Sequence, residues 1–144
     1  MELLSETIVE NPLVSIVHVV GRLDGASYLA LVEKARELFQ RGTDHLILDL
    51  EACAFLSSAG LFALHNIALM AYKYEPLDHE NGWRAMKIMA DEKRDFTDRF
   101  KIVNVPPNIM QTLTAAGVTS LYGIYPDTQA ALAALDPVVS TARG

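Results

Sequence analysis

The chain has 144 residues, of which 51% are hydrophobic, and it carries a net charge of −6. This length and apolar content favour a single compact domain that buries a substantial core. The excess of acidic residues argues against a nucleic-acid partner, because phosphate contacts require a basic surface.

Three features of the sequence favour a cytoplasmic protein. Residues 1–11 contain three Glu and no basic residue, so they do not have the composition of a signal peptide. No uninterrupted apolar run reaches the about 18 residues that a membrane-spanning helix needs. Cys53 is the single cysteine, so an internal disulfide cannot form, as expected for a reducing compartment.

The beginning of the chain predicts a β-hairpin. Residues 3–9 and 14–20 are rich in β-branched side chains, which is typical of strands, and Asn11-Pro12 between them indicates a turn. Gly21 to Gly25 then interrupts the strand pattern, so we expect the second strand to end before Gly21.

Several further elements follow from apolar periodicity and from the residues that begin and end helices. Gly42 and Gly117 each follow a predicted helix, and Asp127 precedes another, as expected for helix caps. The sequence predicts helices at 27–41, 108–116 and 128–135, and strands at 100–105 and 121–125.

The stretch from His45 to Leu64 organises the rest of the chain. Leu46 to Leu50 is an apolar run broken only by Asp49, which is typical of a buried strand. Small residues follow at 57–60 and form a tight turn. Beyond the turn, three-to-four spacing predicts an amphipathic helix from Ser58 to about Lys73, and its apolar face consists of Leu61, Leu64, Ile67, Ala68 and Ala71.

This arrangement places a serine hydroxyl at the N-terminus of a helix. One interpretation of Ser58 is an ordinary N-cap that accepts a hydrogen bond from a free backbone N–H group. The same position also favours negative charge, because backbone N–H groups and the positive end of the helix dipole meet there.

The run Asp49-Leu50 followed by Phe55-Leu56-Ser57-Ser58-Ala59-Gly60-Leu61 resembles the central motif of STAS domains, the fold of bacterial anti-sigma factor antagonists. The usual motif has Asp where this chain has Ser57, and often a second Ser where it has Ala59. The stretch Gly21 to Asp24 is similar to the family's Gly-x-Leu-Asp turn. The resemblance covers about Val14 to Leu135, apart from 74–98, and implies an α/β fold: a mixed β-sheet with helices packed mainly on one side.

The resemblance implies a regulator of transcription controlled by phosphorylation. In these antagonists, the first serine after the motif's Asp is phosphorylated by an anti-sigma kinase, and that position is Ser58; Ser57 is the alternative acceptor if the register shifts by one residue. The unphosphorylated form binds the kinase and frees the sigma factor. The implied partners are an anti-sigma serine kinase and a serine phosphatase, with no cofactor. The expected contact residues are Asp24, Ser57, Ser58, Ala59, Gly60 and Leu61, although Asp24 also suits a residue that starts a helix.

A second hypothesis keeps the fold without the switch. The chain would then be a STAS scaffold or a regulatory subunit, for example of a transporter or a stress-signalling assembly. The missing Asp at Ser57 and an atypical insertion at about 74–98 favour it. In this insertion Trp83, Met86 and Met89 form an apolar stripe that suits a protein partner or a homodimer contact, or that simply covers part of the core.

Residues for catalysis or metal binding are scattered. The four histidines, His18, His45, His65 and His79, have no metal-ligand spacing. No Gly-x-Ser-x-Gly motif surrounds Ser58, and no Walker lysine follows Gly60. Cys53 has apolar neighbours and is expected to be a small buried side chain. We therefore expect a single binding domain without metal, cofactor or enzymatic activity.

Overall fold

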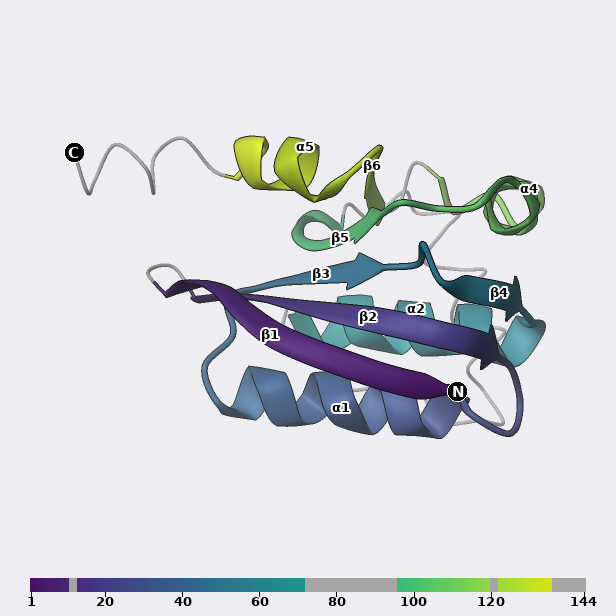
Figure 1. Ribbon diagram of the computed structural model, residues 1–144, viewed down its shortest axis with the longest axis horizontal. Helices are drawn as coiled ribbons and strands as arrows, with labels where there is room; N and C mark the ends of the chain where they lie inside the picture. Colours follow the sequence, from purple (N-terminus) through teal and green to yellow (C-terminus); the bar gives the residue numbers. More distant parts are fainter. Residues whose placement is uncertain (11–12, 72–95, 120–121, 136–144) are drawn as a thin grey trace.

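The computed structural model describes residues 1–10, 13–71, 96–119 and 122–135. These residues form a mixed α/β fold (Figure 1). The strands are β1 (Glu2–Glu10), β2 (Leu13–Leu23), β3 (His45–Asp49), β4 (Cys53–Leu56), β5 (Phe96–Val103) and β6 (Tyr122–Tyr125). The helices are α1 (Tyr28–Gln40), α2 (Ser58–Ala71), α4 (Pro107–Ala115) and α5 (Thr128–Ala133).

The predicted mixed sheet is confirmed. Its strand order is β1-β2-β3-β5-β6, and β4 pairs with β2 outside this order. The hairpin of β1 and β2 is antiparallel, whereas the pairs β2–β3, β3–β5 and β5–β6 are parallel. Helices α1 and α2 lie side by side on one face, and α5 lies on the other (Figure 1). The sheet therefore needs apolar side chains on both faces, and all five residues of β3 are buried.

Two hydrophobic cores stabilise the fold, one on each face of the sheet. The larger core fills the space between the sheet and the α1–α2 pair, and includes Leu48 of β3, Leu31 of α1 and Leu64 of α2. The smaller core lies under α5, where Ala131 contacts a group that includes Ile47. The larger core therefore fixes α2, the helix that follows the serine turn.

Helix α2 is buried around nearly all of its circumference. The predicted amphipathic pattern is wrong in this respect, because Phe62, Ala63 and Leu69 are buried in addition to the expected face, as are His65 and Asn66. Helix α2 contacts α1, β4 and β5, so most of its sides meet protein rather than solvent. In the described part of the chain, no helix is both long enough and apolar enough to cross a membrane.

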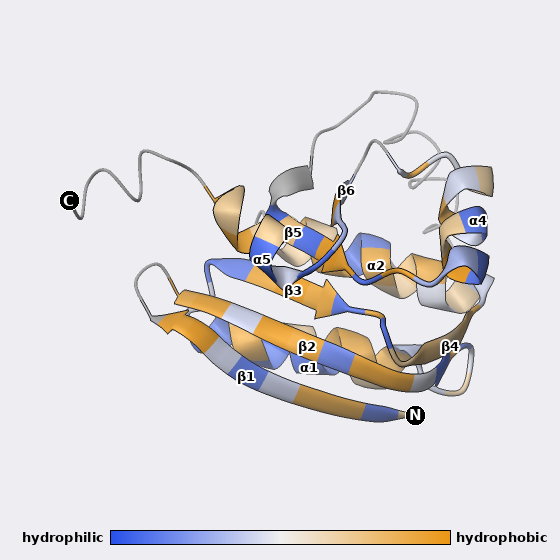
Figure 2. Cartoon of the chain, turned by 45° about the horizontal axis from the view of Figure 1, so that its top comes forward, coloured by the Kyte–Doolittle hydropathy of each residue, from blue (hydrophilic) through white to orange (hydrophobic). Residues whose placement is uncertain are grey.

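The structure corrects the prediction where β2 was expected to end. Strand β2 continues through Gly21, which adopts a φ of +104° and donates its N–H to the Ala52 carbonyl at 3.0 Å. Beyond this irregularity, Arg22 and Leu23 pair with Phe55 and Leu56 of β4. The residues of β4 are not predicted to form a strand by the sequence pattern. They form a strand because all four are apolar (Figure 2) and because β2 extends far enough to pair with them.

Some predictions fall outside the described residues. These are the Asn11-Pro12 turn, the end of α2 near Lys73 and most of the predicted insertion, including Trp83, Met86 and Met89. The last part of that insertion, residues 96–98, belongs to β5.

Candidate functional site

The start of α2 is held against the end of β2. The Ser57 N–H donates to the Leu23 carbonyl at 3.0 Å. Two residues into the helix, Gly60 lies so close that an added Cβ would stand 2.6 Å from the same carbonyl oxygen. A side chain at this position would collide with backbone, so the close approach requires glycine. The contact brings the predicted Asp24 turn and the predicted serine turn to the same end of the molecule (Figure 1).

Ser57, rather than Ser58, caps α2. The Ser57 Oγ accepts a hydrogen bond from the Gly60 N–H at 3.2 Å, and the Ser57 carbonyl accepts one from the Leu61 N–H at 2.9 Å. Ser58 is the first residue of the helix and is exposed. The interpretation of Ser58 as an ordinary N-cap is therefore wrong, since Ser57 occupies that position.

The start of α2 carries no negative charge of its own. Its first turn contains no acidic residue, and its cap is the neutral hydroxyl of Ser57. The helix dipole favours an anion at this end by roughly 0.3–1 kcal/mol. An anionic group on Ser58 would therefore meet a favourable local field.

Asp24 shapes the turn between β2 and α1. Its Oδ1 accepts a hydrogen bond from the Ala26 N–H at 3.0 Å and lies 3.3 Å from the Ser27 Oγ. The hydrogen bond from the Ala26 N–H lowers the pKa of the Asp24 carboxyl group. The N-cap position of α1 is Ser27, so Asp24 stabilises the preceding turn and does not cap the helix directly.

The other predicted contact residues differ in their exposure. Ala59 is partly exposed, whereas Gly60 and Leu61 are buried, and only 8% of Leu61 is accessible to solvent. Leu61 belongs to the larger core. Gly60 and Leu61 therefore position the start of α2, and the surface itself is formed by Asp24, Ser57, Ser58 and Ala59.

The structure adds two residues to this end of the molecule that the sequence does not indicate. The Arg22 guanidinium carbon lies 4.4 Å from the centroid of the Phe55 ring, and the Arg22 Nε lies 3.5 Å from the Asp24 Oδ2. Arg22 belongs to the turn motif from Gly21 to Asp24, and Phe55 belongs to the motif around Ser58. Their contact depends on the pairing of β2 with β4, which the sequence pattern does not predict.

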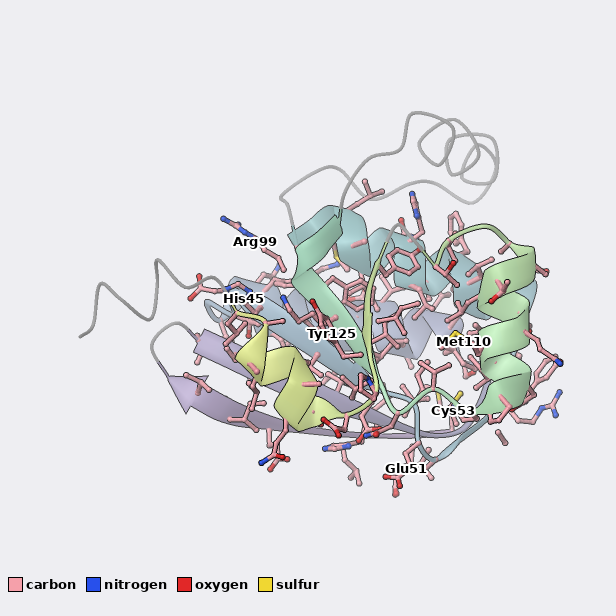
Figure 3. All side chains as sticks on the ribbon, turned by 90° about the horizontal axis from the view of Figure 1, so that it is seen from above. His45, Glu51, Cys53, Arg99, Met110 and Tyr125 are labelled. Atoms are coloured by element: carbon pink, nitrogen blue, oxygen red, sulfur yellow. The ribbon has the colours of Figure 1, made fainter. Side chains whose placement is uncertain are left out.

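Asp49 links three segments next to the turn that leads into β4. Its carboxylate accepts hydrogen bonds from the Glu51 N–H at 2.9 Å and from the Asn104 Nδ2 at 3.2 Å, and lies 2.9 Å from the His18 Nδ1. Asn104 adopts a left-handed φ of +56°, which asparagine tolerates better than most residues. Glu51 extends from this turn at the margin of the molecule (Figure 3).

The candidate metal ligands remain apart in the fold. His45 and Cys53 lie well apart (Figure 3), and the His65 Nδ1 is 3.2 Å from the Tyr122 hydroxyl. Among the residues that the structure describes, no three His, Cys, Asp or Glu side chains are placed to hold a metal ion. Cys53 is buried, as predicted, and its burial raises the pKa of the thiol.

Comparison with known proteins confirms the resemblance. Residues 7–72 match the sequence model of the STAS domain. The matched segment extends from β1 to the end of α2 and contains both the Asp24 turn and the Ser57–Ser58 turn. Over these residues the chain is therefore similar to a STAS domain. No curated protein sequence matches it.

Solved structures with this fold span nearly the whole chain. An anti-sigma factor antagonist from Mycobacterium paratuberculosis has a TM-score of 0.62 and 23% identity, covering 93% of this chain and 94% of its own. The anti-sigma factor antagonist SpoIIAA in its unphosphorylated form has a TM-score of 0.51 and 14% identity, covering 99% of both chains. The Bacillus cell fate determinant SpoIIAA in its phosphorylated form has a TM-score of 0.51 and 15% identity, covering 90% of this chain and 96% of its own. The chain shares the fold of these proteins.

Proposed function

We propose that the chain is an anti-sigma factor antagonist that binds an anti-sigma serine kinase while Ser58 is unmodified and is released once Ser58 is phosphorylated. The observation that carries the proposal is the position of Ser58. Its side chain is exposed at the first residue of α2, whereas Ser57 caps the helix. The hydroxyl of Ser58 can therefore be modified without loss of the cap.

The modification is a phosphoryl transfer. The kinase transfers the γ-phosphoryl group of ATP to the Ser58 Oγ, and ADP and the hydroxyl proton leave. The phosphate adds a charge of about −1.5 to −2. The fold tolerates this charge because the first turn of α2 is free of acidic residues and the helix dipole favours an anion there.

The same charge prevents docking of the partner. A kinase surface that closes over the uncharged Ser58 must desolvate the phosphate after modification, and any nearby carboxylate then repels it. The switch thus acts through surface charge and needs no rearrangement of the fold. A serine phosphatase would restore the binding form.

The structural neighbours support this proposal at the level of the fold. SpoIIAA has been solved in an unphosphorylated and in a phosphorylated form. A fold of this kind is therefore compatible with both states. The proposal for this chain rests on the geometry of Ser57 and Ser58.

A second candidate function is a STAS scaffold or regulatory subunit that is not phosphorylated. The neutral residue at Ser57 favours it, because the family motif often has Asp there. The structure supplies a counterargument: the Ser57 Oγ already performs the capping that an Asp carboxylate would provide. The two candidates therefore differ in kinase recognition rather than in fold.

Intact-mass measurement separates these candidates. The purified chain is incubated with ATP and each anti-sigma kinase from the same genome, as wild type, Ser58→Ala and the matched control Ser57→Ala. We expect one added phosphate on the wild type and on Ser57→Ala, and none on Ser58→Ala. Ser58→Glu should bind the kinase at least about tenfold more weakly than the wild type. Kinase binding without any phosphate transfer would favour the scaffold.

A further inference from the structure

The surface beside Ser58 carries an aromatic ring in contact with a guanidinium group. Phe55 lies on β4, three positions before Ser58, and is 38% exposed. Arg22 on the neighbouring strand stacks over this ring, with its guanidinium carbon 4.4 Å from the ring centroid. The Arg22 side chain is itself 63% exposed. Both groups are therefore accessible to a partner that docks at Ser58.

Backbone pairing fixes the aromatic–guanidinium pair relative to Ser58. Arg22 and Phe55 are opposite each other in the register of β2 and β4. The next residue of β2, Leu23, accepts the hydrogen bond from the Ser57 N–H. The Asp24 carboxylate lies 3.5 Å from the Arg22 Nε and forms an ion pair with the guanidinium. The pair and the phosphorylatable serine therefore belong to one rigid unit.

Small, exposed residues lie close to the pair in the sequence. Ala54 precedes Phe55 on β4, and Gly25 and Ala26 follow Asp24 in its turn. Asn108 of α4 borders the same strand, where its Nδ2 donates to the Ala54 carbonyl at 3.2 Å. A partner can thus approach the ring closely. Aromatic and arginine side chains surrounded by energetically neutral neighbours are the usual centres of binding energy in protein interfaces.

We propose that Phe55 and Arg22 together form the anchor through which this chain selects its kinase, an inference that rests on the proposed function. The Phe55 ring enters an apolar socket on the kinase and loses its remaining solvent exposure. The guanidinium faces a carboxylate on the rim of that socket, because the planar fork of arginine matches carboxylate geometry.

The anchor and the switch have separate tasks. Phe55 and Arg22 supply affinity for the kinase in the unmodified state, whereas the charge on Ser58 decides release. Loss of the anchor therefore weakens docking but leaves the Ser58 hydroxyl and its chemistry unchanged. In the phosphorylation reaction this predicts a higher KM for the chain with kcat maintained.

The test uses the full chain and the kinase that phosphorylates the wild type. Calorimetry compares the wild type with Phe55→Ala, Arg22→Ala and the control Leu4→Ala. Leu4 is also an exposed apolar residue, at 52%, but it lies on β1 opposite His18. We expect Phe55→Ala to weaken binding at least about tenfold, Arg22→Ala about fivefold, and Leu4→Ala less than about twofold. KM should rise in parallel for the first two variants, with kcat within about twofold of the wild type.

Variants that destabilise the fold need a second measurement. If Phe55→Ala lowers the thermal midpoint of unfolding, the binding measurement is made with Phe55→Leu instead. Weaker kinase binding by a folded Phe55→Leu then supports the anchor. Wild-type affinity of folded Phe55→Ala or Phe55→Leu would overturn the anchor while leaving the proposed function intact. If every kinase fails to bind or phosphorylate the wild type, the proposed function fails and the anchor fails with it.

Discussion

Helices α2 and α5 begin in similar ways but differ in charge. In each, a side-chain oxygen accepts a hydrogen bond from the backbone N–H three residues later: Ser57 from Gly60 at 3.2 Å, and Asp127 from Ala130 at 2.8 Å. The carboxylate of Asp127 offsets the positive end of the α5 dipole, whereas the hydroxyl of Ser57 leaves that of α2 unbalanced. The comparison shows that the α2 start, but not the α5 start, can accept an added anion favourably.

The two helices also differ in what holds them in place. Helix α2 is buried on nearly all sides and its first turn is pressed against β2. Helix α5 has six residues, of which only Ala131 is fully buried in the smaller core. Packing therefore dominates the stability of α2, whereas the cap is a large part of what fixes α5. Perturbing each helix in turn tests this difference.

The largest effect is expected from Gly60→Ala. The new Cβ would meet both the Leu23 carbonyl oxygen and the Leu56 side chain at 2.6 Å, so α2 must move away from β2. We expect a loss of about 3 kcal/mol in the free energy of unfolding, measured by urea denaturation. The matched control is Gly25→Ala, since a Cβ at Gly25 meets nothing within 4 Å. Equal stability of the two variants would contradict the close packing of the α2 start.

The next effect concerns pH and His65, within α2. Burial lowers the pKa of His65 to about 4, whereas the unfolded chain titrates near 6.5. Protonation therefore favours the unfolded state as the pH falls from about 6.5 to about 4. This group should remove about 2 to 3 kcal/mol from the free energy of unfolding over that range.

The measurement is urea denaturation between pH 4 and pH 7 on the wild type and on His65→Gln. The glutamine variant cannot titrate, so its stability should fall less steeply with acid. The variant also loses the imidazole near the Tyr122 hydroxyl, and a lower stability at pH 7 is expected for that reason. Parallel pH profiles for the two proteins would show that His65 does not titrate as the structure indicates.

The smallest effect is expected at α5. Asp127→Ala removes the cap and should cost about 1 kcal/mol, detected as faster hydrogen exchange in α5 and a lower midpoint in urea. Asp127→Asn is the control, because an amide oxygen can still accept the Ala130 N–H while the charge is lost. Hydrogen exchange in α2 should stay unchanged in both variants. Equal exchange rates in α5 for wild type and Asp127→Ala would contradict a helix that depends on its cap.

Much of the fold could be predicted from local patterns. The strand ending at Asp49, the hairpin and the glycines that follow α1 and α4 all have strong local signals, and the structure contains each of them. The motif around Ser58 was sufficient to predict the fold class. These features depend on residues close together in the sequence, so a single chain reveals them.

The parts that the sequence did not reveal depend on pairing between distant segments. Strand β4 forms only because β2 continues past Gly21, a residue that locally resembles a turn. The contact between Arg22 and Phe55 depends on that pairing. The choice of Ser57 over Ser58 as the cap is a shift of one residue, which periodicity cannot resolve. The additional buried residues Phe62, Ala63 and Leu69 are apolar, so they were a usable signal that α2 is enclosed.

Cys53 can serve as a native probe of local opening, because its thiol is buried in the folded protein. It is the single cysteine in the sequence, only 3% of it is exposed, and it lies on β4 two positions before Phe55. Burial also raises the pKa of its thiol, so the reactive thiolate is scarce. A thiol reagent should therefore label the folded protein only when β4 separates from β2. The labelling rate then measures how often this end of the domain opens, without any introduced probe.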